Sequence, residues 1–111
     1  MRKNDGRAAL GGMGGSIVSR NILEGKGKLK WCIKEDPMNP IDNGWRFLSD
    51  VDTDEFLSSP QNMVVVSWET VLSFEPLLIA VFDMPIGTDM YIETTNGKKH
   101  FYDTETDEKI L

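Results

Sequence analysis

Apolar and polar residues alternate in residues 28–34, which is the pattern of a strand with one face in a core. The apolar positions are Leu29, Trp31 and Ile33, and the positions between and beside them carry three lysines and a cysteine. A period of two predicts a half-buried strand with this triad facing the core. Residues 16–22 are also β-prone, and a Gly-Lys-Gly turn signal separates the two segments. We therefore expect them to form an antiparallel hairpin.

The next part of the chain predicts a loop, a short strand and a short helix. Residues 35–44 contain two prolines and an Asn-Gly pair, which favour a loop. Residues 45–48 are predicted to form a short strand. Residues 50–58 begin with aspartates and end apolar. Since carboxylates are favourable at the positive end of a helix dipole, this segment predicts a short helix that ends before Pro60.

A strand followed by two helices is expected after Pro60. The unbroken β-branched run in residues 63–66 predicts a central strand buried on both faces. Ser67 is a good helix N-cap, and apolar residues then recur every three or four positions. A proline interrupts this pattern where it is tolerated, as the first residue of a helix. We therefore predict consecutive helices over 67–75 and 76–82.

The strongest hairpin signal in the chain is Asn96-Gly97, which separates the β-prone segments 89–95 and 98–103. Strands and helices together predict the α+β class, with a mostly antiparallel sheet and two short helices packed on one face. A chain of 111 residues suits a single domain, placed here at 16–104. The Gly-rich residues 1–15 are expected to be a flexible tail. Residues 105–111 form an acidic tail that is expected to fray.

Charge is distributed unevenly along the chain, whose formal net charge is −6. Residues 1–34 carry a net charge of +6 and residues 35–111 carry −12. Such acidity is unfavourable for nucleic-acid binding, which depends on cations, and favours cationic partners. It also serves solubility alone, and this interpretation stays open. The longest apolar run has six residues, against about 18 for a membrane span, so no membrane association is expected.

The chain has one cysteine, Cys32, and one histidine, His100. A lone cysteine forms no internal disulfide, which suits a reducing compartment and predicts a cytoplasmic protein. One residue of each type is too few for a structural zinc site, and nothing in the sequence brings the two together as nucleophile and base. Hence no cofactor and no metal are expected.

An acidic run follows the predicted strand at 45–48. Asp50, Asp52 and Asp54 have the alternation that opens an EF-hand calcium loop, but Glu55 stands where that loop needs glycine and Gln61 where it needs glutamate. The run is therefore better interpreted as a solvated helix start or as an acidic patch for a partner.

Two interpretations fit the aromatic segment just before this run. Because Trp45 and Phe47 alternate with Arg46, the segment suits a core strand with a structural ion pair. Exposed Trp and Arg are also the residue types enriched at interface hot spots, so a binding surface is the alternative to the core strand. The predicted partner-binding residues under the second interpretation are Trp45, Arg46, Asp50, Asp52, Asp54 and Glu55.

Four short motifs together resemble a bacterial family. They are Gly44-Trp45-Arg46-Phe47, Asp54-Glu55-Phe56, Pro60-x-Asn62 and Pro85-x-Gly87. The chain is similar over roughly residues 16–95 to a small domain once catalogued as of unknown function and now grouped with the immunity-protein-33-like families of polymorphic toxin systems. The resemblance implies a small cytosolic protein that neutralises a toxin by covering its active site or a nearby surface. It transfers no catalytic residues.

Three functions are compatible with this reasoning. The first is an immunity protein that binds a toxin, with a cationic toxin as the expected partner. The second is a regulatory interaction domain whose partner is not a toxin, and the third is an enzyme that uses carboxylates, with or without a divalent metal. A homodimer is also expected if the 89–103 hairpin leaves an open edge for a second copy.

Overall fold

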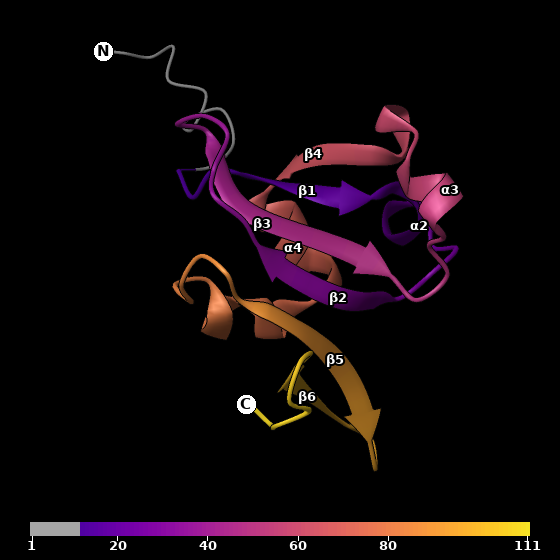
Figure 1. Ribbon diagram of the computed structural model, residues 1–111, viewed down its shortest axis with the longest axis vertical. Coiled ribbons are helices and arrows are strands. Elements are labelled where there is room, and N and C mark those ends of the chain that lie inside the picture. Colours follow the sequence, from indigo (N-terminus) through magenta and orange to yellow (C-terminus); the bar gives the residue numbers. More distant parts are fainter. Residues whose placement is uncertain (1–11) are drawn as a thin grey trace.

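Six strands form an open, mostly antiparallel sheet in the computed structural model, which describes residues 12–111 (Figure 1). The order across the sheet is β4-β1-β3-β2-β5-β6. The β1–β3 pair is parallel and the other neighbouring pairs are antiparallel, which confirms the predicted α+β class. The strands are β1 (Gly15–Ser19), β2 (Leu29–Lys34), β3 (Asp42–Ser49), β4 (Met63–Ser67), β5 (Asp89–Thr95) and β6 (Lys98–Asp103).

Short helices join the strands. They are α2 (Arg20–Leu23), α3 (Asp54–Leu57), α4 (Trp68–Phe74) and the 3₁₀ helices η1 (Pro60–Asn62) and η2 (Pro76–Val81). Ser67 caps α4 as predicted, since its Oγ accepts a hydrogen bond from the Thr70 N–H. The two consecutive helices predicted over 67–82 are present, the second as a 3₁₀ helix. Both contribute to one core on the same face of the sheet, and α4 is seen behind the sheet in Figure 1.

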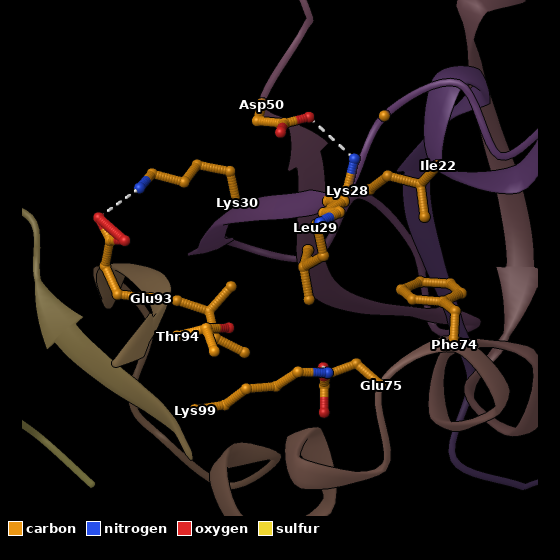
Figure 2. A pocket seen from close by; sticks show the side chains of 12 residues that line it. Ile22, Lys28, Leu29, Lys30, Asp50, Phe74, Glu75, Glu93, Thr94 and Lys99 are labelled. Carbon is orange, nitrogen blue, oxygen red and sulfur yellow. Dashed lines mark hydrogen bonds and ion pairs between the residues drawn. The ribbon is translucent and has the colours of Figure 1, made fainter. Parts of the chain in front are cut away.

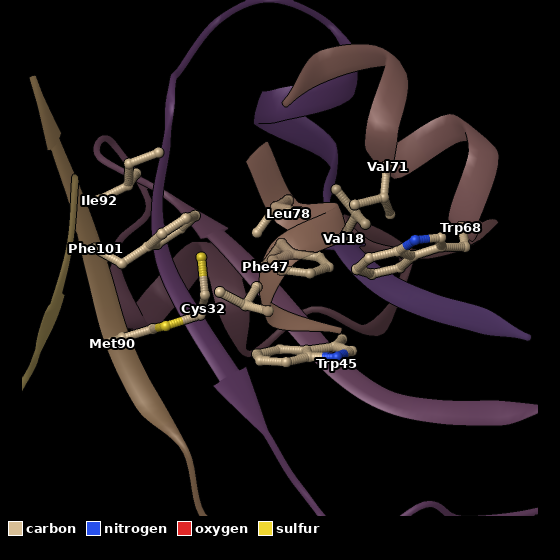
Figure 3. Close-up of a cluster of buried hydrophobic side chains, with 11 residues drawn as sticks. Val18, Cys32, Trp45, Phe47, Trp68, Val71, Leu78, Met90, Ile92 and Phe101 are labelled. Carbon is tan, nitrogen blue, oxygen red and sulfur yellow. The ribbon is translucent and has the colours of Figure 1, made fainter. Parts of the chain in front are cut away.

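The core lies between that sheet face and the helices α4 and η2 (Figure 3). Trp45 and Phe47 of β3 point into it, with parallel rings whose centroids are 5.7 Å apart. Trp68 of α4 completes the aromatic cluster at 6.2 Å from Phe47. These three side chains are fully buried.

The predicted hairpin between residues 16–22 and 28–34 is wrong. The first strand ends at Ser19, whose Oγ caps α2, and β1 then pairs with β3 and β4 and not with β2. β3 lies between β1 and β2 in the sheet. Because Trp45 and Phe47 of β3 are core residues, a strand on each side of β3 sets further buried side chains beside them: Val18 of β1 and Cys32 of β2 are both opposite Phe47. The Gly-Lys-Gly turn signal is local and does not report this packing between strands that are distant in sequence.

The side chains of β2 also face differently from the prediction. Cys32 is fully buried in the core, so its neighbours Trp31 and Ile33 point to the opposite face. Leu29 packs against the core as expected. The pairing with β3 shifts between Leu29 and Trp31, and this irregularity changes the alternation within the strand.

β4 was predicted to be central and buried on both faces, and this is wrong. It forms an edge of the sheet, and the Val65 side chain is 60% exposed. Only the inner face of β4 meets the core, through Val66. The valine run therefore reflects β-propensity and one buried face, since no helical layer formed by residues 12–111 covers the other face of the sheet.

Two predicted boundaries move. The strand expected at 45–48 extends to Asp42–Ser49, which takes residues from the predicted loop. The helix expected at 50–58 shortens to Asp54–Leu57, because Thr53 and not an aspartate caps it through a hydrogen bond from the Phe56 N–H. Asp54 and Glu55 lie in its first turn, as the dipole argument predicted.

The C-terminal residues, which were expected to fray, are hydrogen-bonded to β6. The Ile110 N–H donates to the Phe101 carbonyl at 2.7 Å, and the Phe101 N–H donates to the Leu111 carbonyl at 3.0 Å. The last residues therefore lie along β6. At the other end, residues 1–11 of the predicted tail lie outside the described residues, and Gly15 already belongs to β1. In the described part of the chain, no helix is long and apolar enough to cross a membrane.

Candidate partner-binding surfaces

Trp45, a predicted partner-binding residue, is a core residue. Its side chain is fully buried, and its Nε1 donates a hydrogen bond to the Phe82 carbonyl at 3.0 Å. The hydrogen bond satisfies the one polar atom of the indole, so the ring carries no unpaired donor into the core. Of the two interpretations of this segment, the structure shows the core strand.

Arg46 lies on the opposite face of β3 and is held in an ion-pair network. Its Nη1 and Nη2 donate to the two carboxylate oxygens of Asp42, each at 2.8 Å, and its Nε donates to Oε1 of Glu35 at 2.9 Å. The bidentate bond from Arg46 lowers the pKa of Asp42 to about 2, and Asp42 in turn raises the pKa of Arg46. Arg46 is 7% exposed, which makes it a structural residue.

Asp52 organises the loop that follows β3. Its Oδ1 accepts hydrogen bonds from Ser19 Oγ and Asn21 Nδ2, each at 2.8 Å, and from Ser49 Oγ at 2.6 Å. Its Oδ2 accepts from the Ser49 N–H at 2.7 Å. Burial raises the pKa of Asp52, but the bonds from Ser49, Asn21 and Ser19 together outweigh it, so the pKa lies below its ordinary value. Asp52 therefore ties β3 to the β1–α2 junction.

The other three predicted acids are exposed on this loop and on the first turn of α3 that follows it. Asp50, Asp54 and Glu55 point to solvent, and Asp50 Oδ1 accepts the Lys28 N–H at 2.8 Å. Within residues 12–111, none of the three takes part in an ion pair. The acidic loop (Asp50, Asp54 and Glu55) therefore carries negative charge that no basic side chain of the described chain neutralises at close range.

A groove opens beside this loop where β2 and β5 separate (Figure 2). The two strands pair only between Trp31–Ile33 and Asp89–Tyr91. Past that pairing lies a hollow of about 620 Å³. Its apolar lining comes from α2, β2, α4 and β5, namely Ile22, Leu29, Phe74 and Ile92.

Charged side chains line the same groove. Lys30 Nζ of β2 meets Glu93 Oε1 of β5 at 2.9 Å, and Lys99 Nζ of β6 meets Glu75 Oε1 at 2.7 Å (Figure 2). The Glu75 carboxylate is almost fully buried, whereas the Lys99 side chain is 47% exposed. Asp50 belongs both to the groove and to the acidic loop. The groove and the loop are thus one continuous surface.

The uncovered face of the sheet carries an aromatic stripe that sequence reasoning missed. Trp31, Tyr91 and Tyr102 lie on neighbouring strands and are half-buried, with ring centroids 5.8 Å and 5.4 Å apart. Tyr91 Oη donates to Asp107 Oδ1 at 2.6 Å, and this bond raises the pKa of Tyr91 to about 12. The Asn96-Gly97 turn sets Tyr91 opposite Tyr102, so that pair was predictable; Trp31 was not, because its partner strand was unknown.

The groups considered for chemistry lie apart. Burial raises the pKa of the Cys32 thiol, and the charge of Glu75 raises it further, so the thiol is a poor nucleophile. His100 Nδ1 lies 3.3 Å from the Leu111 carbonyl, and His100 belongs to the edge strand β6, two strands away from β2, which carries Cys32. Among residues 12–111, no three His, Cys, Asp or Glu side chains come together as a metal site.

Comparison with known proteins gives a match to one protein family. The family model described as the immunity protein Imm33 domain matches residues 16–105, which is most of the chain. Neither the curated proteins nor the solved structures give a significant match. The matched region includes the acidic loop, the groove and the aromatic stripe.

Proposed function

This chain belongs to the Imm33 immunity protein domain family, and from that premise we propose that it neutralises a toxin by binding to it directly. The family implies a toxin as the protein partner. The proposed contact surface is the acidic loop together with the adjoining groove, and the proposed toxin is cationic where it meets them.

The observation that carries the proposal is the exposed, unpaired charge of the acidic loop. Asp52 holds the loop in place through four hydrogen bonds, so Asp50, Asp54 and Glu55 are presented on an ordered backbone. An ordered cluster of like charge attracts an oppositely charged partner over long range and raises the association rate. Ordering before binding also reduces the entropy lost on association.

The groove supplies the short-range part of the proposed contact. Its apolar lining offers surface for side chains of the toxin to bury, and its ion pairs can exchange partners at the rim. Burial of apolar side chains in a concave site is a common source of affinity, whereas rim charges act more on rate and specificity. We therefore expect the loop to control association and the groove to control dissociation.

The proposal is tested with the toxin encoded beside this protein. Co-expression is expected to rescue growth, and the purified pair is expected to form a complex whose association rate falls as salt rises. In the triple variant Asp50→Asn, Asp54→Asn and Glu55→Gln, the association rate should fall about tenfold at low salt.

A matched control removes the same number and kind of charges elsewhere. The variant Asp36→Asn, Asp83→Asn and Glu108→Gln changes three exposed acids in other loops and should associate nearly as fast as the parent. Equal losses in both variants would show a net-charge effect and would reject the acidic loop. No rescue and no complex with the neighbouring product would reject the toxin assignment itself.

Two further features of the proposed complex are its cellular compartment and the oligomeric state of this chain. We propose that the complex forms in the cytoplasm, which the single unpaired cysteine supports. A homodimer through the 89–103 hairpin is not favoured by the geometry, because the C-terminal residues already occupy part of the β6 edge. Self-association, if present, needs a different edge.

A further inference from the structure

The carboxylates of Asp42 and Glu75 are buried to nearly the same degree but are bonded differently. The Asp42 side chain is 7% exposed, and its oxygens accept four hydrogen bonds, two from Arg46 and two from backbone N–H groups. The Glu75 side chain is 6% exposed, and within residues 12–111 its oxygens accept two, from Lys99 Nζ at 2.7 Å and from the Leu77 N–H at 3.3 Å. Because a carboxylate has about four acceptor positions, Glu75 can accept further hydrogen bonds from a partner.

The position of Glu75 is fixed by contacts that do not involve Lys99. Glu75 lies between α4 and η2, where its N–H donates to the Val71 carbonyl at 3.1 Å and its carbonyl accepts the Leu78 N–H at 3.2 Å. Its side chain caps η2 through the Leu77 N–H. The carboxylate is therefore held at the groove by its own backbone and by the helix it caps.

Lys99, in contrast, is a counter-ion that can be exchanged. It lies on the edge strand β6, its side chain is 47% exposed, and it extends toward Glu75 across the lower part of the groove (Figure 2). A half-exposed lysine that leaves its partner regains hydration and rotamer freedom, so the exchange costs little. Arg46 differs because it is almost fully buried and holds Asp42 through two nitrogens.

The groove around Glu75 suits one long cationic side chain. Its volume of about 620 Å³ lies in the range of sites that take a ligand group. Leu29, Phe74 and Ile92 give it apolar walls, against which the methylene stem of a long side chain can pack. Such a stem is buried along apolar surface while its charged end reaches a polar group.

The balance of charge also selects a cation. Three lysines and three carboxylates line the groove, so the lining is neutral as a whole: Lys28, Lys30, Lys99, Asp50, Glu75 and Glu93. When Lys99 moves out to solvent, the lining that remains has a net charge of −1, and one incoming cation restores neutrality. An anionic group would instead lie against a carboxylate that the backbone keeps in place.

We propose, on the basis of the toxin-binding function above, that an arginine side chain of the toxin enters this groove, displaces Lys99 and binds Glu75. A guanidinium presents two parallel N–H groups to the two oxygens of a carboxylate, whereas an ammonium is a point charge. Guanidinium is also more weakly hydrated than ammonium, so less hydration is lost when it enters the groove. Lys99 therefore occupies, in the free protein, the place of a toxin residue.

A small probe tests the site without the toxin. N-acetyl-arginine amide is added to the full chain labelled with the nitrogen isotope, and nuclear magnetic resonance follows the Leu77 amide, which bonds to Glu75. The arginine probe is expected to bind weakly and saturably. Its neutral isostere, N-acetyl-citrulline amide, is expected not to bind, and N-acetyl-lysine amide should bind about tenfold more weakly than the arginine probe.

Two substitutions of Lys99 should act in opposite directions. Lys99→Met removes the competing cation and should tighten binding of the arginine probe about tenfold, whereas Lys99→Arg supplies a stronger competitor and should weaken it about tenfold. The matched control Lys98→Met removes the same charge from the next residue of β6, whose side chain alternates to the other face, and should change the affinity less than about twofold. Glu75→Gln should abolish binding. Circular dichroism checks folding, and Lys99→Arg, which keeps the ion pair, decides the test if Lys99→Met does not fold.

Several results would overturn the arginine site. They are equal binding of the arginine probe and either of the other two probes, the same affinity in the parent and in the Lys99 variants, or binding retained in Glu75→Gln. Because no toxin is present, these results would leave the proposed function standing. In the toxin complex, Glu75→Gln should raise the dissociation rate about thirtyfold or more. A complex that is weakened by the acidic-loop variant but not by Glu75→Gln would also reject the arginine site and retain the proposed function.

Discussion

The Asp42–Arg46 ion pair makes a prediction about acid stability that starts from the substitution Asp42→Asn. Asp42 accepts from both terminal nitrogens of Arg46 and from the N–H groups of Met38 and Gly44, each at 2.8 Å. An asparagine retains one acceptor oxygen, but its NH₂ group replaces the second oxygen and then faces N–H donors with which it cannot bond. The variant therefore leaves Arg46 held mainly by Glu35, which is exposed.

The magnitude follows from the pKa of Asp42. Its ordinary value of 3.8 falls to about 2 in the folded protein, and the side chain is only 7% exposed, so solvent screens the pair little. A difference of this size corresponds to about 2 kcal/mol of folding stability. Because the folded-state pKa is the lower one, this stability is complete above the unfolded-state pKa. It is lost as the pH falls from near 4 towards 2.

Urea unfolding at a series of pH values measures this contribution. Trp45 and Trp68 are fully buried, so their fluorescence reports loss of the core. At neutral pH the variant should be less stable than the parent by about 2 kcal/mol or more. That difference should shrink by about 2 kcal/mol as the pH is lowered through the acid range. Other carboxylates titrate in both proteins and largely cancel in the comparison.

Two results would refute the reasoning. A difference between parent and variant that is constant from pH 7 to the acid range would mean that Asp42 has no lowered pKa. A variant as stable as the parent at neutral pH would mean that the Arg46 network is not structural, and Arg46 would again be open to a binding role.

Two further predictions concern Gly44 of β3 and Cys32 of β2. Gly44 has φ +90°, and a Cβ there would lie 2.5 Å from the Glu35 carbonyl oxygen, so Gly44→Ala should lower the free energy of unfolding by about 2 kcal/mol or more. Urea unfolding measures this loss, and Gly87→Ala, with φ +99° but no neighbour within 4 Å, separates strain from collision. The Cys32 thiol should not react with a disulfide reagent in the native protein and should react fully in urea. Labelling of Cys32 under native conditions would contradict its burial.

Some features of the candidate site could be predicted from the sequence and others could not. The exposure of Asp54 and Glu55 follows from local rules, because a capped first helical turn holds acidic side chains near its positive end. The burial of Trp45 and the structural role of Asp52 do not. Asp52 depends on Ser19, which is distant in sequence and comes near only after β1 and β3 have paired.

Local chemistry along the chain was sufficient for turns, caps and the existence of strands. Asn96-Gly97 adopts positive φ at both residues and joins β5 to β6 as predicted, and Ser67 begins α4. In both cases the interactions that decide the outcome lie within a few residues of each other, so the sequence reveals them directly.

The order of strands was decided only by the tertiary structure. Residues 16–22 and 28–34 have turn and strand signals that fit a hairpin, yet β3 lies between the strands β1 and β2 that they form, and the valine run that suits a central strand lies at an edge. Strand pairing depends on which apolar faces meet across the whole chain, and a single residue of irregularity reverses the face of every later side chain. The groove between β2 and β5, the aromatic stripe and the open edge of β4 all follow from that order, which no local pattern encodes.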